Sequence, residues 1–105
     1  MAVMRVLVVE DDPVARSLLV QLLEADGYRV VAVGDGLAAL AEAQDFRPHA
    51  ALIDGNLPDI QGREVARRLR QSSDLPIMFG TPRVRVGRSA ASGAWVGVKG
   101  GRRPA

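Results

Sequence analysis

The sequence predicts an α/β fold with a doubly wound parallel sheet, and three observations support this fold class. Short apolar runs such as 6–9 and 50–53 indicate strands buried on both faces, because helices cover both faces of a parallel sheet. These runs alternate with segments of helical periodicity. Acidic residues close two of the runs, Glu10-Asp11 after the first and Asp54 after the second. The carboxyl ends of parallel strands meet at one edge of the sheet, where functional sites lie.

The first strand is expected at Met4–Val9, and a helix begins directly after it. Asp12 is a good helix cap, and Pro13 suits the first helical turn. Gly27 ends this helix in a left-handed conformation. The apolar stripe of the helix comprises Val14, Leu18, Leu19, Leu22 and Leu23.

The later elements alternate in the same way, which favours right-handed crossovers. They are a strand at Tyr28–Val33, a helix at Leu37–Gln44, a strand at Ala50–Ile53, a helix at Gly62–Gln71 and a strand at Leu75–Phe79. After Gly80 the pattern weakens to a poor helix within 82–93 and a short fifth strand at 94–98. We therefore expect one domain over residues 1–99, degenerate over 82–99, and a disordered tail over 100–105.

The composition of the 105 residues excludes several classes of protein. There is no cysteine, so disulfides, thiol nucleophiles and cysteine metal sites are impossible. No apolar run approaches the roughly 18 residues that a membrane span needs. We expect a cytoplasmic protein without membrane contact.

Charge is divided unevenly along the chain. Residues 1–60 hold ten acids and four arginines, whereas residues 61–105 hold ten bases and two acids. A basic half can bind nucleic acid. These bases are scattered, and Trp95 is the only aromatic residue after Phe79 for base stacking, so we do not expect direct nucleic-acid binding.

The acidic strand ends predict a metal site. Carboxylates of Glu10, Asp11 and Asp54 brought to one edge repel each other, and a cation or a proton must relieve that repulsion. Mg²⁺ prefers oxygen ligands of this kind and is the expected cofactor.

The chain resembles a response-regulator receiver domain, the phospho-accepting unit of two-component signalling. The resemblance covers residues 4–81 and is strongest at Asp54-Gly55-Asn56-Leu57-Pro58-Asp59-Ile60-Gln61-Gly62, which matches the family's D-x-x-[ML]-P-x-x-x-G loop. The segments Val8-Val9-Glu10-Asp11-Asp12-Pro13 and Leu75-Pro76-Ile77-Met78 also match. The implied fold is flavodoxin-like, with strand order 2-1-3-4-5.

The resemblance implies a role for each site residue. Asp54 would accept the phosphoryl group, and Asp11 would bind Mg²⁺ directly. Glu10 would hold the ion through water, and Asn56 would contribute its backbone carbonyl. His49 is expected to be a surface residue.

Two further matches lie in the last quarter of the chain. Thr81 matches the switch hydroxyl, although Pro82 after it also suits an ordinary strand-end threonine. Lys99 matches the lysine that neutralises phosphoryl charge, although Gly100 replaces the usual proline, so a solvated tail lysine is the alternative.

The family's final helix has no counterpart in the sequence, so we expect a C-terminally truncated or divergent receiver. Its absence would leave a few hundred Å² of one sheet face uncovered, and a homodimer through that face is one way to bury it.

Three functional hypotheses follow. The first is a receiver phosphorylated on Asp54 by a histidine kinase or phosphotransfer protein, and not an enzyme beyond self-phosphorylation and autodephosphorylation. The second is a non-switching, receiver-like protein-binding module or a decaying truncated copy. The third is a Mg²⁺-dependent phosphatase-like enzyme, which is disfavoured because no separate general acid stands near Asp54.

Overall fold

The computed structural model describes residues 3–80, in which strands and helices alternate. In chain order the elements are β1 (Arg5–Val9), α1 (Pro13–Ala25), β2 (Arg29–Val33), α2 (Gly36–Phe46), β3 (Ala50–Asp54), α3 (Gly62–Leu69) and β4 (Ile77–Gly80). Each element lies within two residues of the range expected from the sequence at both ends. The expected elements beyond Gly80 lie outside the described residues.

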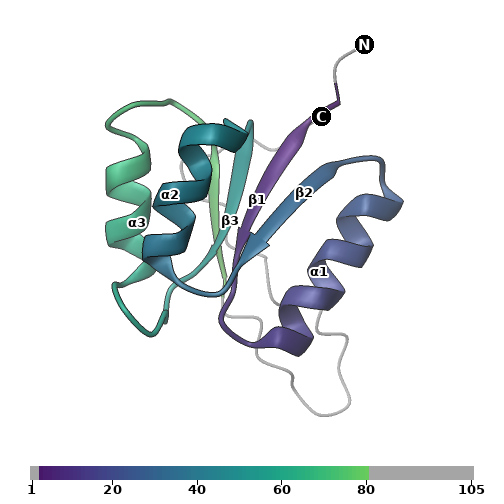
Figure 1. Ribbon diagram of the computed structural model, residues 1–105, viewed down its shortest axis with the longest axis horizontal. Coiled ribbons are helices and arrows are strands. Elements are labelled where there is room, and N and C mark those ends of the chain that lie inside the picture. Colours follow the sequence, from purple (N-terminus) through teal and green to yellow (C-terminus); the bar gives the residue numbers. More distant parts are fainter. Residues whose placement is uncertain (1–2, 81–105) are drawn as a thin grey trace.

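The strands form a four-stranded parallel sheet of order β2-β1-β3-β4 (Figure 1). At the carboxyl end of β1, Val9 pairs with Val33 of β2 and with Ile53 of β3. This register brings the residues after Val9 and Ile53 to the same edge of the sheet. The α/β class, the parallel sheet and the order of its first four strands are therefore confirmed.

Helices cover the two faces of the sheet: α2 and α3 lie on one side and α1 on the other (Figure 1). Alternate residues of β1 point to opposite faces, as strand geometry requires. Leu7 and Val9 join the core cluster on the α2 and α3 side, whereas Val6 and Val8 join the cluster on the α1 side. Because the central strands β1 and β3 are buried on both faces, their sequences are apolar at Val6–Val9 and at Ala51–Ile53.

The ends of α1 follow the local sequence signals. The Asp12 side chain accepts a hydrogen bond from the Val14 amide at 3.2 Å, and Pro13 occupies the first turn. After the helix, Gly27 has a φ of 92°, a conformation that glycine tolerates best. The predicted cap and the predicted stop are both confirmed.

The apolar stripe of α1 is buried only in part. Leu19 is buried, but Val14, Leu18 and Leu22 are 71%, 42% and 43% exposed. The three exposed residues recur every four positions and form their own ridge, rotated by about 100° from Leu19. A five-residue stripe is wider than the face that α1 presents to the sheet.

Within residues 3–80, no helix is both long enough and apolar enough to cross a membrane.

Candidate functional site

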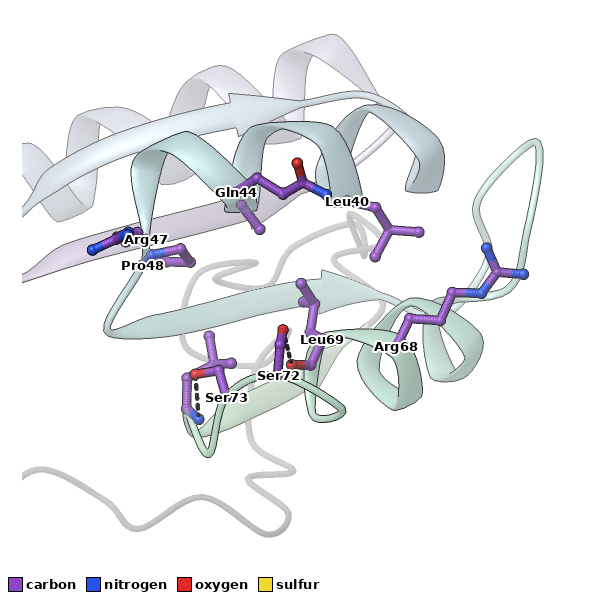
Figure 2. Close-up of a pocket in the computed structure, with 10 residues that line it drawn as sticks. Leu40, Gln44, Arg47, Pro48, Arg68, Leu69, Ser72 and Ser73 are labelled. Atoms are coloured by element: carbon purple, nitrogen blue, oxygen red, sulfur yellow. Dashed lines mark hydrogen bonds between the residues drawn. The ribbon is translucent and has the colours of Figure 1, made fainter.

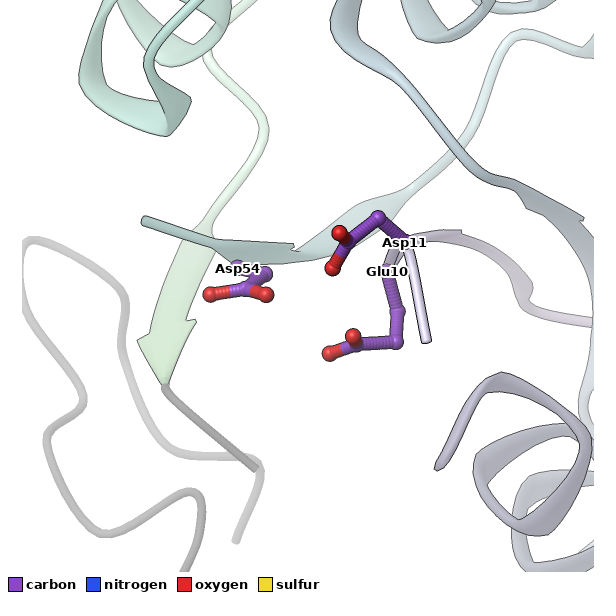
Figure 3. A group of neighbouring side chains, drawn as sticks. All are labelled: Glu10, Asp11 and Asp54. Atoms are coloured by element: carbon purple, nitrogen blue, oxygen red, sulfur yellow. The ribbon is translucent and has the colours of Figure 1, made fainter. Parts of the chain in front are cut away.

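Three carboxylates gather at the carboxyl edge of the sheet. Glu10 and Asp11 follow β1, and Asp54 is the last residue of β3 (Figure 3). One carboxylate oxygen of each lies within 4.8 Å of the others, and the side chains face a common gap. The topology of the sheet produces this group, because β1 and β3 are hydrogen-bonded neighbours.

Glu10 is the most buried of the three, with 2% of its surface exposed. Its Oε2 accepts a hydrogen bond from the Asp12 amide at 2.8 Å. Its Oε1 is buried and has no hydrogen-bond partner within the described part of the chain. Such an orphaned oxygen is rare in a folded protein and indicates that a proton or a cation completes the site.

The electrostatic environment makes Glu10 hard to ionise. Burial is the main cause that raises its pKa, which reaches about 7. The hydrogen bond from the Asp12 amide opposes this rise, and the charges of Asp54 and Asp11 add to it. Either a proton on Glu10 or a bound cation therefore reduces the negative charge of the group.

Asp54 is buried and Asp11 is exposed, so the group opens to solvent on the Asp11 side. The Asn56 amide donates to Asp54 Oδ1 at 3.1 Å and orients the carboxylate. The loop after Asp54 closes at Gly62, whose amide donates to the Gly55 carbonyl at 3.2 Å. A Cβ on Gly62 would collide with the Asp54 carbonyl oxygen, which explains glycine at this position.

The structure brings together the residues that the sequence placed in one metal site, namely Glu10, Asp11 and Asp54. Asn56 lies beside this group, and its backbone amide donates a hydrogen bond to Asp54. Thr81 and Lys99 lie outside the described residues. His49 is half-buried, and its Nδ1 accepts a hydrogen bond from the Arg5 amide at 2.9 Å.

Sequence reasoning missed the part played by Asp59. Its carboxylate reaches across to α2 and accepts hydrogen bonds from the amides of Gly36 and Leu37, each at 2.8 Å. The partners stand 23 and 22 residues earlier in the chain, so no local sequence signal could have indicated the contact.

A separate pocket of about 610 Å³ lies near the amino ends of the strands, between the C-terminal parts of α2 and α3 (Figure 2). Leu40, Leu69 and Leu75 supply apolar lining, and Arg47 and Arg68 are its charged residues. It contains no carboxylate, and the acidic group stands at the opposite edge of the sheet. The carboxylates that could hold a metal ion therefore lie in the acidic group and not in this pocket.

The model of the response regulator receiver domain family matches residues 6–94. The chain belongs to this family. The match includes the whole acidic group and the loop that follows Asp54. The chain is accordingly a signalling domain of the two-component type, as its resemblance to receivers predicted.

Relatives with curated descriptions and solved structures agree with this assignment. The DNA-binding response regulator MtrA of Mycolicibacterium smegmatis is 39% identical over 75 residues, which are 71% of this chain and 33% of that protein. The chain thus spans about a third of the length of the curated regulators it matches.

Two solved structures show the same architecture. The chemotaxis protein CheY4 of Vibrio cholerae superposes with a TM-score of 0.74 at 32% identity, over 81% of this chain and 73% of that one. The complex of the histidine kinase ThkA with the response regulator protein TrrA matches with a TM-score of 0.70 at 30% identity, over 85% of this chain and 78% of that one.

Proposed function

We propose that this receiver accepts a phosphoryl group on Asp54 from a phosphohistidine, with Mg²⁺ as cofactor. The observation that supports the proposal is the carboxylate group itself, with its oxygens within 4.8 Å and one of them, Glu10 Oε1, buried without a partner. Family membership makes phosphoryl transfer the expected use of such a group.

The donor set fits Mg²⁺. Carboxylate oxygens are the ligands this ion prefers, and a divalent cation would relieve both the repulsion and the unpaired oxygen. Glu10 and Asp11 would hold the ion together with Asp54 and the backbone carbonyl of Asn56. Bound there, the ion would neutralise the charge of the incoming phosphoryl group.

The chain's own residues would then carry out the transfer. A carboxylate oxygen of Asp54 attacks phosphorus in line with the phosphorus–nitrogen bond of the donor. That bond breaks with its electron pair going to the imidazole nitrogen, and a mixed anhydride forms on Asp54. The amide of Asn56 keeps the carboxylate oriented for this attack. Thr81 and Lys99 are proposed to contact the transferred group from the segment after β4.

The proposed donor is a histidine kinase or a phosphotransfer protein. The solved ThkA–TrrA complex, in which a histidine kinase is bound to a response regulator, supports this class of partner. We also propose that the receiver unit spans residues 1–99 and that a homodimer can form through one face of the sheet. The non-switching binding module is the less favoured alternative, because the acidic group is complete.

A phosphorylation assay tests the proposal. Incubated with acetyl phosphate and Mg²⁺, the protein should gain one phosphoryl group that is stable to acid and released by hydroxylamine. Asp54→Asn and Asp54→Ala should abolish the label, whereas the exposed Asp45→Asn should not. Label that persists in both Asp54 variants, or that maps to His49, contradicts the proposal.

A titration tests the metal separately. Asp11→Asn removes a charge from the exposed side of the group and should weaken Mg²⁺ binding by roughly tenfold. Calorimetric Mg²⁺ titration of wild type, Asp11→Asn and Asp45→Asn measures this. An unchanged affinity in Asp11→Asn would show that the ion binds elsewhere.

A further inference from the structure

Asp59 stands in the loop between Asp54 and α3 but is bonded to a different part of the chain. Its Oδ1 accepts hydrogen bonds from the amides of Gly36 and Ile60, and its Oδ2 accepts one from Leu37, all at 2.8 Å. Gly36 and Leu37 are the first two residues of α2. One carboxylate therefore joins the acceptor loop to the start of the neighbouring helix.

The start of α2 suits a second carboxylate. The first amides of a helix have no partner within the helix, and the helix dipole favours negative charge there. Asp35 caps α2 in the ordinary way, through the Ala38 amide at 2.7 Å. Asp59 satisfies the two amides before Ala38. Although desolvation works against ionisation, the backbone hydrogen bonds lower the pKa of Asp59 to about 2.

Tight packing fixes the same junction. A Cβ on Gly36 would stand 2.5 Å from Ile60 Cγ1 and 2.7 Å from Val65 Cγ2, so the loop and the helix start are in close contact. At its two ends the loop is closed by the bond from the Gly62 amide to the Gly55 carbonyl. Asn56, whose backbone amide orients Asp54, lies in the sequence between Gly55 and Asp59. It therefore belongs to the segment that is fixed at both of these residues.

We propose that Asp59 is a positioning residue, which fixes the acceptor loop to α2 and thereby keeps the backbone of Asn56 and the carboxylate of Asp54 aligned for phosphoryl transfer. This inference rests on the proposed function. In the proposed reaction, Asp59 contacts neither the phosphoryl group nor the residues that hold the metal ion. It acts through the backbone between Asp54 and Gly62.

Asp59→Ala and Asp35→Ala form a matched pair for the test. Each removes a carboxylate from the start of α2, but only Asp59 is also part of the acceptor loop. Phosphorylation by acetyl phosphate is measured at saturating donor and Mg²⁺, with Mg²⁺ affinity measured alongside. Asp59→Ala should lower the maximal rate about tenfold and change the Mg²⁺ affinity by less than about twofold, because misalignment affects the attack most. Asp35→Ala should stay within about twofold of the wild-type rate.

Equal rates in the two variants, or a wild-type rate in Asp59→Ala, would overturn the inference. The isosteric Asp59→Asn serves if Asp59→Ala does not fold. It keeps one acceptor oxygen but places an amide group towards the Leu37 N–H, and it should also slow the reaction.

Amide hydrogen exchange gives a readout that needs no phosphorylation. In Asp59→Ala the amides of Asn56 and Gly62 should exchange faster than in wild type, whereas in Asp35→Ala they should not. That difference would support the role of Asp59 in fixing the loop to α2, whether or not the protein is phosphorylated. A wild-type protein that accepts no phosphoryl group would reject the proposed function but not this role of Asp59. Unchanged exchange of both amides in Asp59→Ala would show that Asp59 does not fix the loop to α2.

Discussion

At the scale of single residues, Glu10 shows how one buried group can make stability depend on pH. Its pKa is about 7 in the folded protein, against an ordinary value of 4.5. Between these values the folded state holds a proton that the unfolded state has released. The stabilisation from that proton is complete below pH 4.5 and is lost as the pH rises through 7.

We therefore predict that, in EDTA, the free energy of unfolding falls by up to about 3 kcal/mol between about pH 4.5 and pH 7, and that Glu10→Gln removes this fall. Asp59 and Glu64 both have a pKa of about 2 and titrate below this window. Urea denaturation between pH 4.5 and pH 7 measures the effect.

Parallel pH profiles of the free energy of unfolding for wild type and Glu10→Gln would contradict this prediction. Mg²⁺ should restore stability most at the alkaline end, because it binds the ionised carboxylates.

The three carboxylates of the site could be predicted from sequence, because each stands at the end of an apolar run and parallel topology brings such ends together. The contacts of Asp59 and His49 could not be predicted in this way. Their bonds to Arg5, Gly36 and Leu37 join residues that lie 22 to 44 positions apart in the chain. Both residues stand in segments whose local pattern indicates only a loop or the start of a strand.

At the scale of elements, the loop between β3 and α3 depends on the absence of a side chain at Gly62. An added Cβ would meet the Asp54 carbonyl oxygen and stand 3.0 Å from both the Gly55 Cα and Ile53 Cγ2. Two of these three atoms belong to the backbone and cannot rotate away. The loop can therefore accept a larger residue only by moving Asp54 itself.

Gly62→Ala should destabilise the fold by about 1–3 kcal/mol and slow phosphorylation, because overpacking displaces the acceptor. Gly55→Ala is the matched control, since a Cβ there meets nothing within 4 Å, and its stability should stay within about 0.5 kcal/mol of wild type. Urea denaturation and the acetyl-phosphate assay measure the two effects. Equal stabilities for the two variants would show that the loop adapts more easily than its geometry indicates.

Helix α1 shows where periodicity alone is insufficient. Its capping residue and its stop could be predicted, because both signals are local. Which apolar residues face the sheet could not be predicted, because a run of leucines fits several adjacent faces of a helix. The orientation of α1 on β1 and β2 decides that Leu19 is buried and Leu18 is not.

At the scale of the whole molecule, the sheet separates two clusters of buried residues, which differ in size within the described part of the chain. Among residues 3–80, the cluster on the α2 and α3 side contains ten buried residues, and the cluster on the α1 side contains four. Half-buried residues pack against both clusters, for example Leu23 and Tyr28 on the α1 side and Leu40 on the other side. The alternation of helices and strands predicts two covered faces, but not this inequality, which depends on how the helices pack.

Val8 and Val9 offer a direct comparison of the two cores. Both are valines with 0% exposure on the same strand, and they point to opposite faces of the sheet. Val9→Ala should cost roughly 2–3 kcal/mol, because nine other buried residues within residues 3–80 form its cluster and limit how far the cavity can close. Val8→Ala should cost roughly 1–2 kcal/mol, because only three other buried residues within residues 3–80 form its cluster, and the half-buried residues around them can shift into the space.

Urea denaturation of both variants in the full chain measures the difference. An equal or larger loss for Val8→Ala would mean that the α1 side is packed as rigidly as the other. Such a result would also show that the half-buried residues there are held in place. If the order is as expected, the face of the sheet behind α1 is the more deformable part of residues 3–80.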